Sequence, residues 1–373
     1  MIPPKHDPIT VLVVGQVPPP HHGQAVMIER LLAGHYPGIT LHHVPMRFSA
    51  DLDEIGRLRL GKLSELVRVI LAIHRVAWRT HPRILYYPPA GPDLIPMLRD
   101  GAILLATRWL FPKTIFHFHA GGVGLRCRRL PWPLRSLLRA AYHGADIGIR
   151  TTTLAPPDPE ILGIRADHIV PNGIDDRAAA WLDRRNRDAA VPTILYVGLM
   201  CEEKGVLVLL DALARLRQRG ARFRAVLVGA PAEPSFTAEL VRCVGAAGLA
   251  DVVTCPGQLI GEDKWRAYAD ADIFCFPSFY RSEAFPLVVI EALSFALPVV
   301  STLWRGIPDI VADTECGYLV PPHDADALAD RLQRLLADPD LRQRLGENGR
   351  QRFLSRFTSA AYRRAMEAVF RAV

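Results

Sequence analysis

Twelve short runs of β-branched and aliphatic residues recur along this chain, and longer helical patterns separate them. The runs are apolar on both faces, which is typical of parallel strands covered by helices on both sides. Their alternation with helices predicts doubly wound α/β sheets. Six strands are predicted in the first half, at residues 9–14, 39–44, 83–87, 114–119, 145–149 and 168–171. Six more are predicted in the second half, at residues 193–198, 224–229, 251–255, 272–276, 298–301 and 317–320.

A chain of 373 residues is long for one hydrophobic core and sufficient for two. We expect a first Rossmann-like domain over residues 1–175, a polar linker over 176–192 and a second Rossmann-like domain over 193–355. A closing helix over 356–373 is expected to pack back toward the first domain. Ligands bind at the carboxyl ends of strands in open α/β sheets, so we expect the two domains to face each other across a cleft.

Two carboxylates interrupt the apolar stretch SEAFPLVVIEALSFALPVV, which covers residues 282–300. These acids are Glu283 and Glu291, and a carboxylate is rarely buried without a partner. Either both reach solvent at a favourable helix end, or polar groups meet them inside. Ionised carboxylates only accept hydrogen bonds, so hydroxyl groups of a ligand are suitable partners. Two acids beside an anion site would suit a nucleotide sugar.

A possible anion site follows the strand that ends at Gly198. The sequence LMCEEKG continues from there to a helix that begins near Val206, and Lys204 supplies a cation. Glycine allows close approach of the backbone, and a helix N-terminus favours an anion. The alternative is an ordinary strand–turn–helix connection with a surface lysine.

These segments together resemble retaining glycosyltransferases of family four, which have the GT-B fold. The segment EAFPLVVIE at 283–291 matches the Glu-x7-Glu motif of that family. Other matching segments, in the family's order, are VPNGID at 170–175, YVGLMCEEKG at 196–205, ADADIFCFPS at 269–278, GIPDIV at 306–311 and GYLVPPHDADALADRL at 317–332. The resemblance covers nearly the whole chain and is strongest over residues 170–332.

The resemblance implies roles for several residues of the second domain. Glu291 would bind the ribose hydroxyls of the donor, Glu283 the donor sugar, and Lys204 the diphosphate. Backbone groups would assist at Phe285, Leu287 and Val288, and contacts near Leu259 would bear on the choice of base.

In the first domain the resemblance points to two segments. PPPHHGQA at 18–25 follows the first strand, where Gly23 fits a loop near phosphate and acceptor. His119 matches a histidine near the reacting sugar, although it is also compatible with a strand-end histidine bonded to backbone. His117 and His119 share a strand face, so a metal pair is possible by spacing. The family is metal-independent, so we expect neither metal nor cofactor.

The sequence departs from the family pattern at three positions. His22 stands where a second glycine is common in the loop after the first strand. Leu199 stands where the family commonly has an arginine that gives the diphosphate a second cation. Either Arg281 or Arg305 substitutes, or donor binding is weaker. Asp309 replaces the usual glutamate of GIPDIV, which is a smaller change.

Positive charge is concentrated in the first half of the chain. The net charge is +7, and residues 1–175 account for all of this excess. The charge gathers in two stretches, which include Arg57, Arg59, Lys62, Arg68, Arg75, Arg79 and Arg83, and then Arg126, Arg128, Arg129, Arg135 and Arg139. They predict either a solvated helical face or a surface for anionic lipid or an acidic substrate. Nucleic acid is disfavoured, because no binding module or interleaved aromatic residues accompany them.

The sequence thus predicts a metal-independent, retaining glycosyltransferase that uses a nucleotide diphosphate sugar and a lipid-linked or glycan acceptor. Six scattered cysteines, and an N-terminus without a signal-like apolar stretch, suit the cytoplasm. Peripheral contact with the inner face of the cell membrane is also expected. The alternatives are a GT-B-type sugar-nucleotide epimerase and a non-catalytic subunit that binds nucleotide sugar. A dehydrogenase is disfavoured, since no G-x-G-x-x-G follows a strand.

Overall fold

The computed structural model describes residues 8–19, 22–48, 60–182 and 191–373, without the side chains of residues 60–62. Several residues of the predicted features therefore lie outside the described residues. These are Arg57, Arg59 and the Lys62 side chain of the first basic stretch, Pro20 and His21 of the loop after the first strand, and residues 183–190 of the expected linker.

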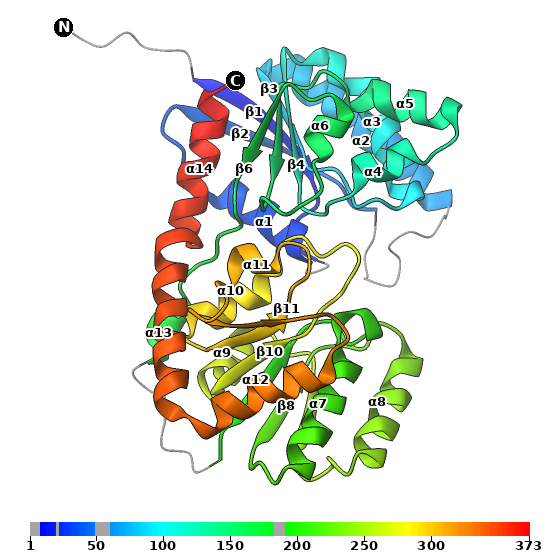
Figure 1. The fold of residues 1–373 in the computed structure, drawn as a ribbon. Helices are drawn as coiled ribbons and strands as arrows, with labels where there is room; N and C mark the ends of the chain where they lie inside the picture. Colours follow the sequence, from blue (N-terminus) through cyan, green and yellow to red (C-terminus); the bar gives the residue numbers. More distant parts are fainter. Residues whose placement is uncertain (1–7, 20–21, 49–59, 183–190) are drawn as a thin grey trace, which may run out of the picture. The chain divides into compact units, whose positions relative to one another are not determined.

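The chain forms two compact units (Figure 1). Unit 1 comprises Met1–Gly173 together with Ser359–Val373, and unit 2 comprises Ile174–Thr358. The expected linker includes residues that fold within unit 2. Ala178 is fully buried in its core, and Asp176 forms an ion pair with Arg350. Within the described ranges, no helix combines the length and apolar character that crossing a membrane requires.

Unit 1 contains a parallel six-stranded sheet in the order β2-β1-β3-β4-β5-β6. Its strands are β1 (Ile9–Gly15), β2 (Ile39–Pro45), β3 (Ile84–Tyr87), β4 (Lys113–Phe118), β5 (Ile147–Arg150) and β6 (Ala166–Ile169). Its helices are α1 (Gly23–Ala33), α2 (Leu60–Thr80), α3 (Leu94–Thr107), η2 (Arg108–Leu110), α4 (Val123–Arg128), α5 (Trp132–Tyr142), α6 (Asp158–Leu162) and α14 (Ser359–Arg371). α2 packs on α3, and α3 packs on α5, so these three helices form one layer.

Helix α14 closes unit 1 through aromatic packing. The Phe370 ring makes edge contacts with Tyr36 and Tyr86, with centroids 5.9 and 6.1 Å away. Arg371 donates a hydrogen bond to the carbonyl of Pro37. The last residues of the chain therefore complete the core of the unit that contains its first strand.

Unit 2 contains a second parallel sheet, in the order β12-β11-β10-β7-β8-β9. Its strands are β7 (Thr193–Val197), β8 (Arg224–Val228), β9 (Val253–Gly257), β10 (Ile273–Phe276), β11 (Val299–Thr302) and β12 (Gly317–Val320). Its helices are η3 (Ala178–Ala180), η5 (Glu202–Lys204), α7 (Val206–Gln218), α8 (Pro234–Ala246), α9 (Gly261–Ala269), α10 (Leu287–Ser294), α11 (Ile307–Ile310), α12 (Ala325–Ala337) and α13 (Pro339–Arg356). Counted within the unit, this is the Rossmann order 3-2-1-4-5-6 read from its other edge. The order reverses between β7 and β10.

All twelve predicted strands are present, with ends shifted by up to two residues. β6 and β9 are each displaced by two residues at both ends. At β9 the strand begins later because Val252 donates to the carbonyl of Leu249 in a turn before it. The prediction of two doubly wound α/β sheets is confirmed.

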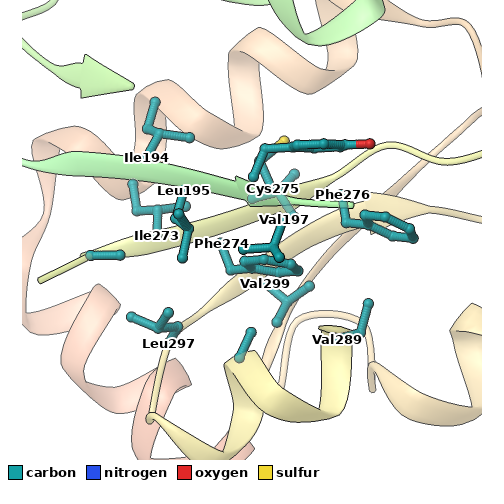
Figure 2. Packing of buried hydrophobic residues seen from close by; sticks show 14 of the residues in the cluster. Ile194, Leu195, Val197, Ile273, Phe274, Cys275, Phe276, Val289, Leu297 and Val299 are labelled. Atoms are coloured by element: carbon teal, nitrogen blue, oxygen red, sulfur yellow. The ribbon is translucent and has the colours of Figure 1, made fainter. Parts of the chain in front are cut away.

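The core of unit 2 holds the sheet against α10. Aliphatic and aromatic side chains of β7, β10 and β11 fill the space between the strands and this helix (Figure 2). Val289 of α10 and Phe276 at the end of β10 are both fully or nearly fully buried. The first turn of α10 is therefore anchored at the carboxyl edge of the sheet.

Candidate functional site

Two loops meet where the strand order of unit 2 reverses. One follows β7 and contains Lys204, and the other follows β10 and contains Glu283. Since β7 and β10 are parallel neighbours, both loops leave from the same edge of the sheet. This is the position at which open α/β sheets bind ligands.

Gly205 allows the two loops to approach closely. Its φ is +76°, and a Cβ placed there would lie 2.0 Å from the carbonyl oxygen of Pro277. Glu203 then joins the loops, since its carbonyl accepts a 2.8 Å bond from Phe279 and its carboxylate a 3.3 Å bond from Arg281, both from backbone amides. Only glycine satisfies both the conformation and the contact at 205.

Lys204 and Glu283 form a mostly buried ion pair. The Lys204 Nζ lies 2.6 Å from the Glu283 Oε2, and the two side chains are 15% and 9% exposed. Ser278 donates a 3.0 Å hydrogen bond to the same oxygen. The ammonium also lies 4.5 Å from the ring centroid of Tyr280 and 5.5 Å from that of Phe276, which adds cation–π attraction.

Glu291 has a separate pair of partners on α9. Lys264 Nζ lies 2.7 Å from its Oε1, and Tyr268 donates a 2.8 Å hydrogen bond to its Oε2. Burial beside this carboxylate raises the pKa of the Tyr268 hydroxyl well above its usual value, so Tyr268 stays protonated and donates. Lys264 also lies 4.9 Å from the ring centroid of Trp265.

Of the two alternatives for the acids, the structure agrees with the one in which polar groups meet them inside. Neither reaches solvent as an exposed helix-end acid, and each already has a lysine partner within the protein. Lys264 and Tyr268 were missed by the sequence reasoning. The available signal was their spacing of four residues, which places a cation and a hydroxyl on one face of a predicted helix.

Helices α7 and α10 begin at this edge of the sheet, and neither has a side-chain hydrogen bond at its N-cap. The amides of Leu287 and Val288 belong to the first turn of α10, which lacks internal acceptors. The Phe285 side chain packs against Phe357 in the core, so only its backbone is suited to a ligand. Gly198 is half-buried, and a Cβ there would lie 3.0 Å from the Tyr196 hydroxyl, so a side chain at this position would be crowded.

Leu199, which replaces the family's arginine, and Arg305, a candidate to substitute for it, differ in their surroundings. Leu199 is half-buried, and its carbonyl accepts a 2.9 Å bond from Tyr196. Arg305 has φ +50°, and its guanidinium lies 5.6 Å from the ring centroid of Trp304. The Trp304 indole donates a 2.9 Å bond to the carbonyl of Tyr280, whose ring contacts Lys204.

Arg281 and Leu259, two further predicted residues, lie elsewhere in unit 2. Arg281 is an exposed residue of the β10 loop. Leu259 is half-buried between β9 and α9, the helix that carries Lys264. Leu259 therefore lies five residues before Lys264, the lysine partner of Glu291.

His119 of unit 1 directly follows β4 and stacks on His117. The ring centroids are 3.9 Å apart, and His117 Nδ1 shares a 2.6 Å hydrogen bond with the Tyr86 hydroxyl. Within the described part of the chain, both ring nitrogens of His119 are buried without a hydrogen-bond partner. Burial, with a smaller contribution from His22, lowers the pKa of His119 to about 3. The His119 ring is therefore neutral at pH 7.

Gly23 is the first residue of α1, and the His22 side chain caps that helix by accepting from Ala25 at 3.3 Å. A Cβ at Gly23 would meet no atom within 4 Å, so the space beside it is open. The imidazole ring takes the capping role that a smaller polar side chain usually fills.

Comparisons with known proteins match both the sequence and the fold. Residues 180–352 match the family described as Glycosyl transferases group 1. The chain is 31% identical over 247 residues to the alpha-D-kanosaminyltransferase of Streptomyces kanamyceticus, covering 66% of this chain and 57% of that protein. It is 27% identical to the putative colanic acid biosynthesis glycosyltransferase WcaL of Salmonella typhimurium, covering 84% of each. The chain spans 49% to 62% of the length of three of its curated relatives.

Solved structures extend the likeness over the whole chain. Sucrose-phosphate synthase of Thermosynechococcus elongatus superposes with a TM-score of 0.73 at 22% identity, covering 97% of this chain and 98% of that one. Anabaena HepE in complex with UDP superposes with a TM-score of 0.74 at 16% identity, covering 98% and 100%. At such low identity the likeness establishes a common fold and no more.

We expect Lys264→Met to destabilise the protein by about 3 kcal/mol, because it leaves the Glu291 carboxylate buried without its cation. Urea unfolding measures this. Adding Glu291→Gln to that variant should restore most of the loss, since the unpaired charge is removed.

The matched control is Arg219→Ala, which removes an exposed ion pair with Asp330 and should cost less than about 1 kcal/mol. Equal costs for Lys264→Met and Arg219→Ala would contradict the role of Lys264.

Acid should destabilise the protein through His119. Its folded pKa of about 3 lies below the usual 6.5, so between these values the unfolded chain binds more protons. Stability from this residue is thus fully present above pH 6.5 and is lost as the pH falls toward 3. His119→Phe keeps a stacking ring without a titrating group, so its melting temperature should fall less steeply with acid. His35→Gln, at an exposed histidine, is the control; parallel profiles for His119→Phe and the unsubstituted protein would refute this assignment.

Proposed function

Because residues 180–352 of this chain belong to the glycosyl transferases group 1 family and its two units have the GT-B fold, we propose that the protein is a glycosyltransferase. It transfers a sugar from a nucleotide diphosphate sugar to an acceptor hydroxyl. The observation that carries the proposal is the pair of lysine-bound carboxylates, Glu283 and Glu291, in the part of unit 2 where the strand order reverses.

The diphosphate of the donor is assigned to Lys204. An ammonium has three N–H donors, so Lys204 can keep its bond to Glu283 and still donate to phosphate oxygens. The N-termini of α7 and α10 add partial positive charge at the same edge. Together they would stabilise the leaving diphosphate electrostatically, as a metal-independent transfer requires.

The two carboxylates are assigned to different hydroxyl groups of the donor. Glu283 accepts from the sugar, and Glu291 accepts from the ribose while Lys264 and Tyr268 hold it in position. Backbone groups at Phe285, Leu287 and Val288 contact the donor at the start of α10. Gly198, the first residue of the β7 loop, is also assigned to donor binding. Leu259, just before α9, is the proposed contact for the base.

Arg305 is the proposed second cation in place of the arginine that Leu199 replaces. Its φ of +50° is unfavourable for a non-glycine residue, and strained conformations of this kind cluster at functional sites. Contacts through Trp304 and Tyr280 connect it to Lys204.

In unit 1, His119 and Gly23 are assigned to the reacting sugar and to the acceptor side. A neutral imidazole both donates and accepts a hydrogen bond, which suits a sugar hydroxyl. We further propose that the transfer retains the anomeric configuration, as the family resemblance implies.

The acceptor is proposed to be a growing glycan or a lipid-linked sugar. A relative named for colanic acid biosynthesis and another named as an O-antigen chain mannosyltransferase support polysaccharide or glycolipid assembly. The positive surplus of residues 1–175 supports contact with an anionic lipid surface at the inner face of the cell membrane.

Incubation of the purified chain with a panel of nucleotide sugars tests the proposed function. We expect one donor to raise the melting temperature most, and that donor should release nucleotide diphosphate in the presence of a suitable glycan or lipid-linked acceptor. Conversion of a nucleotide sugar to an isomer without an acceptor would point instead to an epimerase. Donor binding without turnover for any acceptor would reject the transferase.

Lys204 and Glu283 should respond differently to substitution. Lys204→Ala removes a cation from the diphosphate and should weaken the free nucleotide diphosphate about 10- to 100-fold. Glu283→Gln keeps the size of the side chain and releases the Lys204 ammonium from its ion pair. The affinity for free nucleotide diphosphate should therefore hold or improve, while turnover falls. Isothermal titration and steady-state rates measure the two effects.

Arg219→Ala, at the opposite end of α7, is the control cation and should leave both quantities unchanged. If Glu283→Gln loses as much affinity for nucleotide diphosphate as Lys204→Ala, the assignment of the diphosphate to Lys204 and of the sugar to Glu283 is wrong.

A further inference from the structure

Helix α2 exposes an apolar stripe on the side turned away from its sheet. Leu63, Val67, Leu71 and Trp78 are all exposed, and Trp78 reaches 82%. At about 100° per residue these positions fall within an arc of about 80°. The residues that α2 buries, such as Val69 and Ile73, lie on the opposite side. The helix therefore has two apolar faces, and only one of them is covered.

The neighbouring helices expose further large apolar side chains. Ile95 and Leu105 of α3 and Leu137 of α5 are exposed, and Trp109 of η2 and Trp132 of α5 are 71% and 69% exposed. α3 packs between α2 and α5, so all these residues belong to one layer of helices. The exposed residues of α2 are neighbours at helical spacing, and soluble monomers rarely expose a contiguous apolar stripe of this kind unless it binds something. We call the exposed side of α2, α3, η2 and α5 the outer face.

The charge on the outer face has one sign. Arginines lie beside the apolar residues at exposed positions of α2 and α5, namely Arg68, Arg75, Arg79, Arg135 and Arg139. The acids within α2, α3 and α5 are Glu65 and Asp100, and both are buried. Glu65 pairs with Arg68, and Asp100 accepts from Tyr87 and Arg99. The surface is thus apolar and cationic, which complements an anionic lipid bilayer.

A hollow of about 660 Å³ lies between the end of α2 and η2. Arg75, Arg79 and Trp78 line it, together with Leu110. Trp109 is fixed nearby, since its indole donates a 3.0 Å bond to the carbonyl of Ala106 and its ring contacts His74. Two arginines beside a tryptophan are suited to the depth of the phosphate head groups in a bilayer. Tryptophan is enriched at that depth in membrane proteins.

We propose that the outer face of α2, α3, η2 and α5 lies in the surface of an anionic membrane, with its apolar side chains inserted among the acyl chains and its arginines at the phosphates. This deepens the membrane contact of the proposed function and needs no transfer reaction. An amphipathic surface of this composition binds by apolar burial together with electrostatic attraction. A protein partner would more often meet mixed charges on the rim of its binding surface.

Flotation of the full chain with vesicles tests the proposal, without nucleotide sugar. Binding is expected to vesicles in which about a third of the lipid is phosphatidylglycerol, and to weaken but persist at about 0.5 M salt, where charges are screened within about 4 Å. Leu71→Ser with Trp78→Ser should reduce the vesicle affinity about tenfold or more, because the inserted apolar area is lost. Arg75→Gln with Arg79→Gln should remove the preference for phosphatidylglycerol over pure phosphatidylcholine.

Val241→Ser with Leu354→Ser is the matched control, since both residues are exposed apolar side chains on helices of unit 2. It should leave vesicle binding unchanged. Lipids brominated in the acyl chain should also quench the tryptophan fluorescence of the unsubstituted protein, which reports insertion without any substitution.

Two outcomes would overturn the proposal. The first is absence of binding to every vesicle, and the second is equal binding by the Leu71 and Trp78 variant. If that variant binds vesicles equally but changes the protein's size in solution, the outer face is a protein interface. Because vesicle binding and transfer to a soluble acceptor are measured separately, either can fail while the other succeeds.

Discussion

The ion pair between Lys204 and Glu283 determines the arrangement of the candidate site. A carboxylate buried in the loop after β10 is costly without a cation, and the β7 loop supplies one at 2.6 Å. That distance depends on the approach of Gly205 to Pro277, and thus on β7 and β10 being neighbours. Sheet order, loop conformation and charge neutralisation therefore depend on one another in unit 2.

Buried ion pairs are weak evidence for stability, because apolar residues of similar volume often serve equally well. Unit 2 nevertheless has two such pairs, at Glu283 and Glu291, around an edge that is otherwise densely packed with aliphatic side chains. In the proposed function, each carboxylate can still accept a hydrogen bond from a hydroxyl group of the donor, while its lysine neutralises its charge. The outer face of unit 1 contrasts with this site, since its arginines are exposed and its acids are buried.

The sequence was sufficient for the fold because the pattern of apolar runs is local. All twelve strands were predicted, since each run is apolar on both faces and is followed by a helical pattern. The partners of the acids were not predicted, because they depend on strand order. Lys204 lies 79 residues before Glu283, and Lys264 lies 27 residues before Glu291. With the order known, the first pair follows from the adjacency of β7 and β10, but α9 has no sequence feature that marks Lys264 as a partner.

Charge at the candidate site explains why Leu199 is a consequential departure from the family pattern. Lys204 and Lys264 are each neutralised by a carboxylate, so these four side chains together carry no net charge. A diphosphate bound there needs positive charge from other groups. The N-termini of α7 and α10 supply only partial charges, equivalent to about half a unit each. In the proposed function Arg305, held in a left-handed conformation beside Trp304, supplies the full charge that a leucine at 199 cannot. The proposal thus replaces a cation missing from the loop after β7 with one from the loop after β11, which Trp304 joins to the loop after β10.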